Sequence, residues 1–290
     1  MRILNFGSLN IDYVYGVDHF VSAGETIGSS SMDINVGGKG LNQSIAFAKA
    51  GASVCHAGLI GAGGEFLVNY LEKNGVDVKN VGLCDTPTGN AIIQVDKNGQ
   101  NCILLFGGAN MKVTEEYADK VLGGYGEGDM LILQNEISSV PYIIEKAHSL
   151  GISVVLNPSP ITESLKDYPL EQVDWFIVNE IEGKAITGET SPEAIADKMR
   201  SLYPKSRTVL TLGADGAAYI DAESFIKVPA GKGKPVDTTA AGDTFTGYFF
   251  TGISKGMSPE ESLIWATKAS DITVTRKGAA ESIPYASEIC

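Results

Sequence analysis

The sequence predicts an α/β protein: a doubly wound, mostly parallel sheet with helices on both faces, plus a small β-sheet lid. Two observations predict the sheet. Short β-branched or apolar runs alternate with helical periods, and polar residues follow the ends of those runs. A third predicts the lid, since residues 13–34 and 90–106 break the alternation. We therefore expect a single domain over residues 1–290, with a lid formed by about 13–34 and 90–106.

Each element of the sheet follows from a local pattern. Apolar or β-branched runs predict strands at residues 3–6, 54–60, 130–133, 154–156, 176–178 and 209–212. Helical periods are illustrated by Leu41, Ile45 and Ala48, which recur at i, i+4 and i+7. The predicted helices span residues 41–50, 66–74, 141–150, 192–202, 244–256 and 259 to about 275.

The lid is predicted from a hairpin. Residues 91–95 and 102–106 flank a turn at 96–99 and read as two antiparallel strands. A small isolated sheet leaves one face and its edges unprotected, so pairing of two lids in a homodimer is expected.

Composition limits the classes of function. With 43% hydrophobic and 20% charged residues, the chain has the balance of an ordinary globular protein. Its 22 basic and 35 acidic side chains give a formal net charge of −13, and only four residues are arginine. No basic face is expected, which excludes nucleic acid and anionic membranes as partners. No apolar run approaches the ~20 residues of a membrane span.

The cysteines indicate a compartment. Cys55, Cys84, Cys102 and Cys290 lie far apart without a C-x-x-C pair, and the chain opens on an apolar run rather than a signal peptide. We expect a reduced, cytoplasmic protein whose cysteines serve as small buried hydrophobic side chains.

Polar residues follow the predicted strands in chain order. They are Asn10 and Asp12, residues 134–136, Asn157, Asn179 and Gly213. In a doubly wound sheet ligands bind beyond the carboxyl ends of the strands, so a site is expected there. Any one of these residues could instead cap a turn.

Residues 236–245 carry the strongest site signal. The small residues Ala240, Ala241 and Gly242 precede a predicted helix and leave its first amides bare. Unpaired N–H groups and the helix dipole together bind an anion such as a phosphate. Asp243 in that first turn is either an acceptor for a ligand proton or an ordinary helix N-cap. A cap alone would not need three small neighbours.

A second segment, residues 35–44, places three glycines before a helix. Glycines allow a ligand to approach the backbone closely, and Lys39 and Asn42 add polar groups. The spacing is not that of a Walker P-loop, and a turn without function is the alternative.

Residues 37–61 and 237–247 resemble the paired signatures of the ribokinase-like, or PfkB, carbohydrate kinase family. The likeness covers essentially the whole chain and also includes residues 7–12, 211–216 and 275–279. The resemblance implies an enzyme that phosphorylates a sugar hydroxyl with ATP and Mg²⁺.

The resemblance also assigns roles. Asp243 would be the catalytic base, and the amides of Ala240, Ala241 and Gly242 would form the anion hole. Residues expected to bind the sugar are Asn10, Asp12, Gly38, Lys39, Asn42, Glu136 and Asp243. Residues expected to face the nucleotide are Asn179, Thr211, Gly213, Ala214, Asp215, Gly216, Gly242 and Thr267.

Two cation sites are implied as well. Asn179 and Glu182 match a motif that organises Mg²⁺ through water, and a carboxylate with waters suits that hard ion. The alternative for Glu182 is an exposed helix residue. A K⁺ site beside the anion hole would use the side chains of Asp237 and Ser282 and the carbonyls of Thr239, Thr273, Arg276 and Gly278.

The substrate stays open at this point. A phosphosugar would need a second basic site, and no arginine falls in the sugar-facing segments, which favours a free sugar: D-ribose, then 2-deoxyribose or fructose. A nucleoside is the rival, because Tyr13, Tyr15 or Phe106 could stack on a base instead of packing within the lid. A Rossmann-type oxidoreductase or a non-catalytic sugar-binding protein are alternatives of another class, although no G-x-G-x-x-G follows the first strand.

Overall fold

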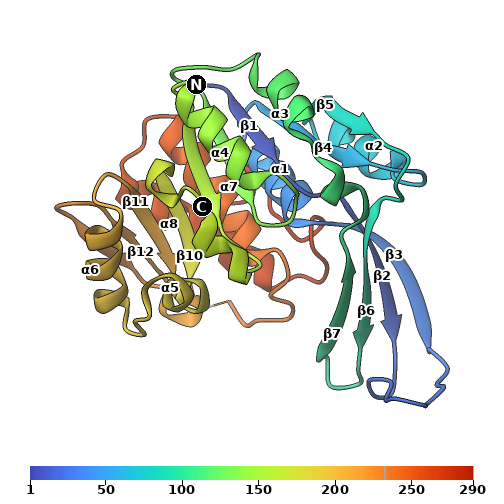
Figure 1. The fold of residues 1–290 in the computed structure, drawn as a ribbon. Helices are drawn as coiled ribbons and strands as arrows, with labels where there is room; N and C mark the ends of the chain where they lie inside the picture. Colours follow the sequence, from blue (N-terminus) through green and yellow to red (C-terminus); the bar gives the residue numbers. More distant parts are fainter. Residues whose placement is uncertain (232, 290) are drawn as a thin grey trace.

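The computed structural model describes residues 1–231 and 233–289 and contains two sheets (Figure 1). The larger sheet consists of β1 (Ile3–Phe6), β4 (Val54–Ile60), β5 (Asp77–Leu83), β8 (Met130–Gln134), β9 (Ser153–Asn157), β10 (Trp175–Asn179), β11 (Arg207–Thr211), β12 (Ala217–Ile220) and β13 (Phe225–Val228). Its strand order is β13-β12-β11-β10-β9-β8-β1-β4-β5. Pairing is parallel from β5 to β11 and antiparallel at β12 and β13. The predicted mostly parallel α/β fold is confirmed.

Helices cover both faces of this sheet. One face carries α1 (Lys39–Lys49), α2 (Glu65–Lys73), α7 (Ala241–Ser254) and α8 (Pro259–Val274). The other carries α3 (Glu115–Leu122), α4 (Val140–Ser149), α5 (Glu180–Thr187) and α6 (Pro192–Leu202). Side chains of β1 alternate between the two cores, with Ile3 in the first and Leu4 and Phe6 in the second. The fold is thus three layers deep, with two hydrophobic cores.

The sequence patterns missed the weaker elements. β5 has polar residues at alternate positions of an edge strand, and β12 and β13 have four residues each. α5 begins directly after β10, without a loop. Short apolar runs at a sheet edge give too little periodicity to be recognised.

The smaller sheet is the lid. It consists of β2 (Asn10–Gly16), β3 (Ser31–Gly37), β6 (Gly89–Val95) and β7 (Asn101–Phe106), in the order β3-β2-β6-β7. Figure 1 shows it extending away from the larger sheet. The predicted hairpin is confirmed, because β6 and β7 pair antiparallel and Gly99 closes the turn with φ 77°.

The two faces of the lid differ in what they meet. Asp12, Val14, Ile93, Ile103 and Leu105 lie on the face that lines the large cleft described below. The alternate residues form the outer face, where one row crosses all four strands through the pairs Ile34–Tyr13, Tyr13–Ile92 and Ile92–Leu104. Ile34 and Leu104 in that row are 55% and 68% exposed. Tyr13 packs against the first core, so the exposed part of this apolar row consists of Ile34, Ile92 and Leu104.

Two smaller expectations are settled by the described residues. None of their helices is long and apolar enough to cross a membrane. Cys55 is buried as expected, but Cys102 is exposed in β7, so the expectation of buried cysteines is wrong there. Cys290 lies outside the described residues.

Candidate active site

A cleft of about 1350 Å³ lies between the carboxyl ends of the central strands and the inner face of the lid. Asn157, Asn179 and Thr211, the last residues of β9, β10 and β11, line it. The strand ends that the sequence marked with polar residues therefore do meet at one site, as expected for a doubly wound sheet.

The amino terminus of α7 opens into this cleft. Ala240 precedes the helix with φ 60°, a left-handed conformation that is uncommon for a residue with a Cβ. No side chain caps the helix, and the N–H groups of Gly242 and Asp243 have no acceptor among the described residues. A Cβ built on Gly242 would meet no atom within 4 Å. Bare amides beside open space are suited to an anion. The Ala241 N–H contributes less, because it already donates to the Thr238 carbonyl at 3.3 Å.

Asp243 is the third residue of α7 and does not cap it. Its carboxylate accepts two hydrogen bonds from α1, at Oδ2 from Asn42 Nδ2 (3.2 Å) and at Oδ1 from Gln43 Nε2 (3.0 Å). The side chain is only 8% exposed and lines the cleft. The N-cap alternative is wrong, because a cap would accept from the backbone of its own helix. The carboxylate is instead fixed beside the bare amides.

Lys39 and Glu136 meet where α1 begins. The Glu136 carboxylate accepts the Lys39 backbone N–H at 3.0 Å and a short hydrogen bond from the Ser8 hydroxyl. Burial raises the pKa of Glu136, against the opposing charge of Lys39. Burial by itself would lower the pKa of the Lys39 ammonium, but three carboxylates around it, led by Asp243, raise it overall. Lys39 thus stays charged in an acidic cleft, and Glu136 holds the helix start.

Asn10 and Asp12 lie on β2 and line the cleft. Asn10 is buried, and its Oδ1 accepts a hydrogen bond from Asn110 Nδ2 at 2.7 Å. Burial, together with the charges of Glu136 and Glu281, raises the pKa of Asp12 to about 7. Gly38, which also lines the cleft, has φ 92° and brings its backbone close to Ser8. These side chains give fixed donors and acceptors to a polar ligand.

Asn179 and Glu182 form a reciprocal capping box at the start of α5. Glu182 N–H donates to Asn179 Oδ1 at 2.9 Å, and the Asn179 backbone and side-chain nitrogens donate to the two Glu182 oxygens. Glu182 is 6% exposed and lines the cleft, so the alternative of an exposed helix residue is wrong. Burial raises the pKa of its carboxyl.

The segment expected to face the nucleotide is only partly at the cleft. Thr211 lines it, whereas Gly213, Ala214 and Asp215 form an exposed 3₁₀ turn just beyond β11. Gly216 must be glycine, because its φ is 97° and a Cβ would lie 2.0 Å from the Val228 carbonyl oxygen. Thr267 does not line the cleft; it lies half-buried on α8, with no partner for its hydroxyl among the described residues.

The two segments expected to hold K⁺ are joined by Asp237. Its Oδ1 accepts from the Thr239 N–H (2.9 Å) and hydroxyl (2.6 Å), and its Oδ2 accepts the Gly278 N–H at 3.1 Å. These bonds lower the pKa of Asp237 although burial opposes them. Thr273 and Ser282 are buried. The Arg276 side chain pairs with Glu288, whereas the predicted cation ligand is the Arg276 carbonyl. Oxygen-rich loops of this kind suit a cation.

The charge of the cleft is strongly negative. Among the described residues, seven carboxylates line it against two lysines, Lys39 and Lys277. The carboxylates are Asp12, Asp33, Glu136, Glu182, Asp237, Asp243 and Glu281. An anion as highly charged as a triphosphate would enter such a site only with a cation. Among the described residues no three acidic, histidine or cysteine side chains converge on one point, so a hard divalent ion would be held here mainly by water and by the phosphates that it accompanies.

Several lining or supporting residues were missed from the sequence. Asn110 orients Asn10, Gln43 holds Asp243, and Glu281 acts on Asp12 by its charge. Gln43 directly follows Asn42 in the glycine-rich segment, which was the one available signal. The contacts of Asn110 and Glu281 are long-range and leave no local pattern.

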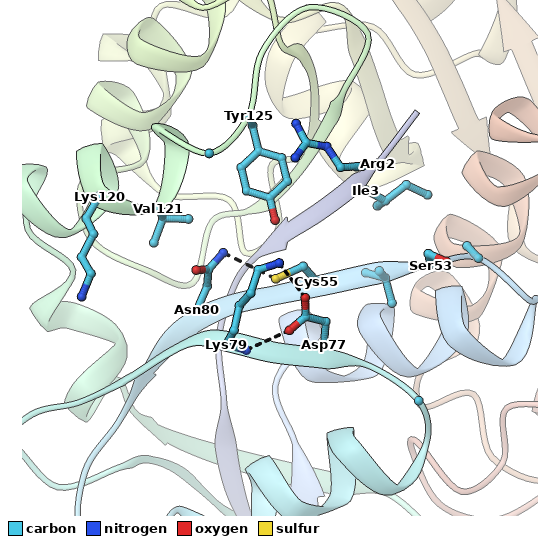
Figure 2. Close-up of a pocket in the computed structure, with 14 residues that line it drawn as sticks. Arg2, Ile3, Ser53, Cys55, Asp77, Lys79, Asn80, Lys120, Val121 and Tyr125 are labelled. Atoms are coloured by element: carbon cyan, nitrogen blue, oxygen red, sulfur yellow. Dashed lines mark hydrogen bonds and ion pairs between the residues drawn. The ribbon is translucent and has the colours of Figure 1, made fainter.

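A second pocket, of about 490 Å³, lies at the opposite edge of the sheet, beside the amino ends of β1, β4 and β5 (Figure 2). Two of its three cations are paired, Arg2 with Asp129 and Lys79 with Asp77 at 2.8 Å. Figure 2 shows Lys79 turned toward Asp77. None of the predicted site residues lines this pocket, whereas most of them line the larger cleft.

Comparisons with known proteins agree with this geometry. The chain is 35% identical to a ribokinase of Haemophilus influenzae over 97% of this chain and 95% of the relative. A solved ribokinase structure from Thermotoga maritima superposes with a TM-score of 0.88 at 36% identity, covering 99% of this chain and 97% of that one. An Arabidopsis thaliana ribokinase complexed with ribose and ATP gives 0.86 at 29% identity, covering 99% and 96%.

The family model of the pfkB family carbohydrate kinases matches residues 2–286. That range includes both sheets and every residue of the cleft. This chain therefore belongs to the pfkB family of carbohydrate kinases.

Proposed function

We propose that the chain is an ATP-dependent kinase that phosphorylates D-ribose to ribose 5-phosphate in a cytoplasmic setting. The observation that carries the proposal is the Asp243 carboxylate, fixed by α1 beside the bare amides of α7 in one cleft. The relatives named ribokinase support the same activity.

The arrangement supplies what phosphoryl transfer requires. That reaction needs positioning and charge stabilisation more than covalent chemistry from the protein. Asp243 accepts the proton of the sugar hydroxyl, and the Gly242 and Asp243 amides stabilise the charge on the transferring phosphoryl group. The inner face of the lid excludes water that would otherwise hydrolyse ATP.

The proposal assigns the Mg²⁺ that accompanies ATP to Asn179 and Glu182. Glu182 would hold waters of the ion, and Asn179 fixes the orientation of that carboxylate through the capping box. When bound, the ion would neutralise phosphate charge in a cleft that is otherwise acidic.

A free sugar fits the cleft better than its rivals. Lys39 and Lys277 are its lysines, and no arginine lines it among the described residues, which leaves little for a second phosphate. Its described lining contains no aromatic side chain either. Tyr13, Tyr15 and Phe106, considered for base stacking, lie on the outer face of the lid. Fructose and 2-deoxyribose remain the alternatives.

The test is a panel of free sugars and nucleosides assayed for ADP release with ATP and Mg²⁺. Ribose-dependent ADP release is expected. Release only with a nucleoside, or with fructose, would reassign the substrate. A change in nicotinamide absorbance would indicate an oxidoreductase, and tight sugar binding without turnover a binding protein.

Gly242→Ala tests the anion site directly. The position has no clash for a methyl group, so the free energy of unfolding should stay within about 0.5 kcal/mol of wild type. The methyl group would occupy the space of the phosphoryl oxygens, and kcat should fall by about 10²-fold. The comparison is kcat against Tm in the same preparation. Unchanged turnover would mean that no anion approaches this amide.

K⁺ activation is the expected behaviour of the Asp237 corner. An ion held by Asp237, Thr239 and Gly278 would steady the loop that leads into α7. The rate in K⁺ should exceed the rate in a bulky inert cation such as tetramethylammonium at equal ionic strength. Equal rates in the two salts would count against the site.

A homodimer through the outer face of the lid is proposed from its apolar row. Leu104→Lys should convert the protein to a monomer, because a charge would be buried in the middle of the paired lids. Light scattering after size-exclusion chromatography measures the mass. Ile181→Lys, at another exposed apolar site on α5 (77% against 68% for Leu104), is the control and should leave the mass unchanged. A monomeric wild type would rule out the dimer.

A further inference from the structure

A chain of buried polar side chains connects Asp243 to the interior. Gln134 Nε2 donates to Gln43 Oε1 at 2.7 Å and to Asn5 Oδ1 at 2.9 Å. Asn5 Nδ2 donates to Ser44 Oγ at 2.8 Å, and that hydroxyl lies 2.8 Å from His56 Nδ1. The members of this chain, Asn5, Gln43, Ser44, His56 and Gln134, are all 0% exposed.

Chemistry fixes the direction of the amide bonds. An amide nitrogen only donates, so the Ser44 hydroxyl accepts from Asn5 Nδ2. The Ser44–His56 contact runs in either direction, according to which ring nitrogen carries the hydrogen. Burial lowers the pKa of His56 to about 3, although a backbone contact with Gly7 opposes this, so the imidazole is neutral and can accept. Gln134 is the branch point, because its two amide hydrogens go to Asn5 and Gln43.

This arrangement leaves Gln43 one orientation. Its Oε1 is held by Gln134, so its amide nitrogen must face the Asp243 carboxylate. Rotating the amide would set its NH₂ group against the NH₂ group of Gln134 and its oxygen against a carboxylate. Apolar side chains could fill the same volume without the cost of burying amides. The network therefore fixes the orientation of the Asp243 carboxylate, at the cost of burying amides where apolar side chains could pack.

We propose that Gln43 is a positioning residue for Asp243, and that Gln134 sets which end of the Gln43 amide faces the base. The inference rests on the proposed function, in which Asp243 takes the proton of the sugar hydroxyl. Gln43 does not line the cleft, so it touches neither sugar nor nucleotide.

The test is a double-mutant cycle on turnover. Gln43→Met keeps the length of the side chain and should lower kcat by about 10²-fold through misplacement of the base. KM for sugar and ATP should stay within about twofold, because bound ligands are not touched. In the Asp243→Asn background the same change should cost less than about twofold. Thr251→Val, which removes an unpartnered buried hydroxyl from α7, is the control and should leave kcat unchanged.

Equal losses in both backgrounds would show that Gln43 only supports the fold, which overturns the proposal. If Gln43→Met does not fold, Gln134→Met takes its place in the same cycle with the same expectations.

Nuclear magnetic resonance gives a readout that does not need activity: the side-chain amide protons of Gln43 should exchange slowly with solvent in the wild type and faster in Asp243→Ala. Rapid exchange of these Gln43 protons in the wild type overturns the proposal. If they exchange slowly but the protein releases no ADP in the presence of sugar, only the proposed function is rejected.

Discussion

Asp243→Asn is expected to lower kcat by about 10²- to 10⁴-fold, because the variant cannot accept the proton of the sugar hydroxyl. Sugar and ATP affinities should change far less, since asparagine keeps the size of the side chain. Initial rates of ribose-dependent ADP release measure the effect, and equilibrium binding separates it from substrate affinity. Turnover near that of the wild type would remove Asp243 from the chemistry.

The same variant has a structural cost that must be measured alongside. One end of asparagine is a donor. Facing Gln43, it meets an amide nitrogen whose orientation Gln134 fixes; facing Asn42, it is accepted only if the Asn42 amide rotates to present Oδ1, and its NH₂ group then loses its present acceptor. Either outcome should reduce the free energy of unfolding by up to about 3 kcal/mol. Asp119→Asn makes the same chemical change at a surface ion pair with Lys146 and should leave kcat unaffected.

Asp12→Asn should make the ligand-free protein more stable while weakening sugar binding. The pKa of Asp12 is raised from 3.8 to about 7, so the folded state disfavours its ionised form. The sign follows from linkage: between these values the folded state binds more protons than the unfolded state, and stability falls as pH rises. Above pH 7 the full penalty is present, and below pH 3.8 it is absent.

A shift of this size corresponds to about 4 kcal/mol, as an order of magnitude. Asparagine removes the ionisation, so its free energy of unfolding should exceed that of the wild type by up to about 4 kcal/mol at pH 8 and by little at pH 4. Urea unfolding at both pH values measures the difference. Loss of a sugar acceptor should weaken ribose binding by about 1–3 kcal/mol.

Asp33→Asn is the matched control, because Asp33 is an exposed carboxylate in the same lid. It should change stability by less than about 0.5 kcal/mol at either pH. An Asp12 variant whose stability gain is equal at pH 4 and pH 8 would show that repulsion and burial of the ionised carboxylate are not the cause.

The sequence was informative wherever an element was long and periodic. β4, α7 and α8 were found from their apolar runs, and the lid hairpin was found from its turn at Gly99. β5 was missed because an edge strand needs no continuous apolar run. Local pattern therefore predicted the layers and the lid but not the edges of the sheet.

The site shows the same limit at the level of single residues. Asp243 could be named from the small residues before it, but whether it capped its helix depended on Asn42 and Gln43, about 200 positions earlier. Glu182 was recognised from a sequence motif, but the motif does not indicate that its side chain is buried, because tertiary packing buries it. Gln134 was marked only as a polar residue at a strand end, and its contact with Gln43 leaves no local pattern. Tertiary contacts decided these points, and a single sequence does not encode them as pattern.

The alternation of the lid strands restricts how this part of the chain can change. Asp12 faces the cleft and its neighbour Tyr13 belongs to the outer apolar row, so inserting or deleting one residue early in β2 would exchange the two. An aromatic ring would then face the cleft in place of Asp12, and a carboxylate would lie among isoleucines and leucines. Insertions and deletions in this part of the chain should therefore occur at the loops at the tips of the lid, or should add or remove two residues at a time within a strand.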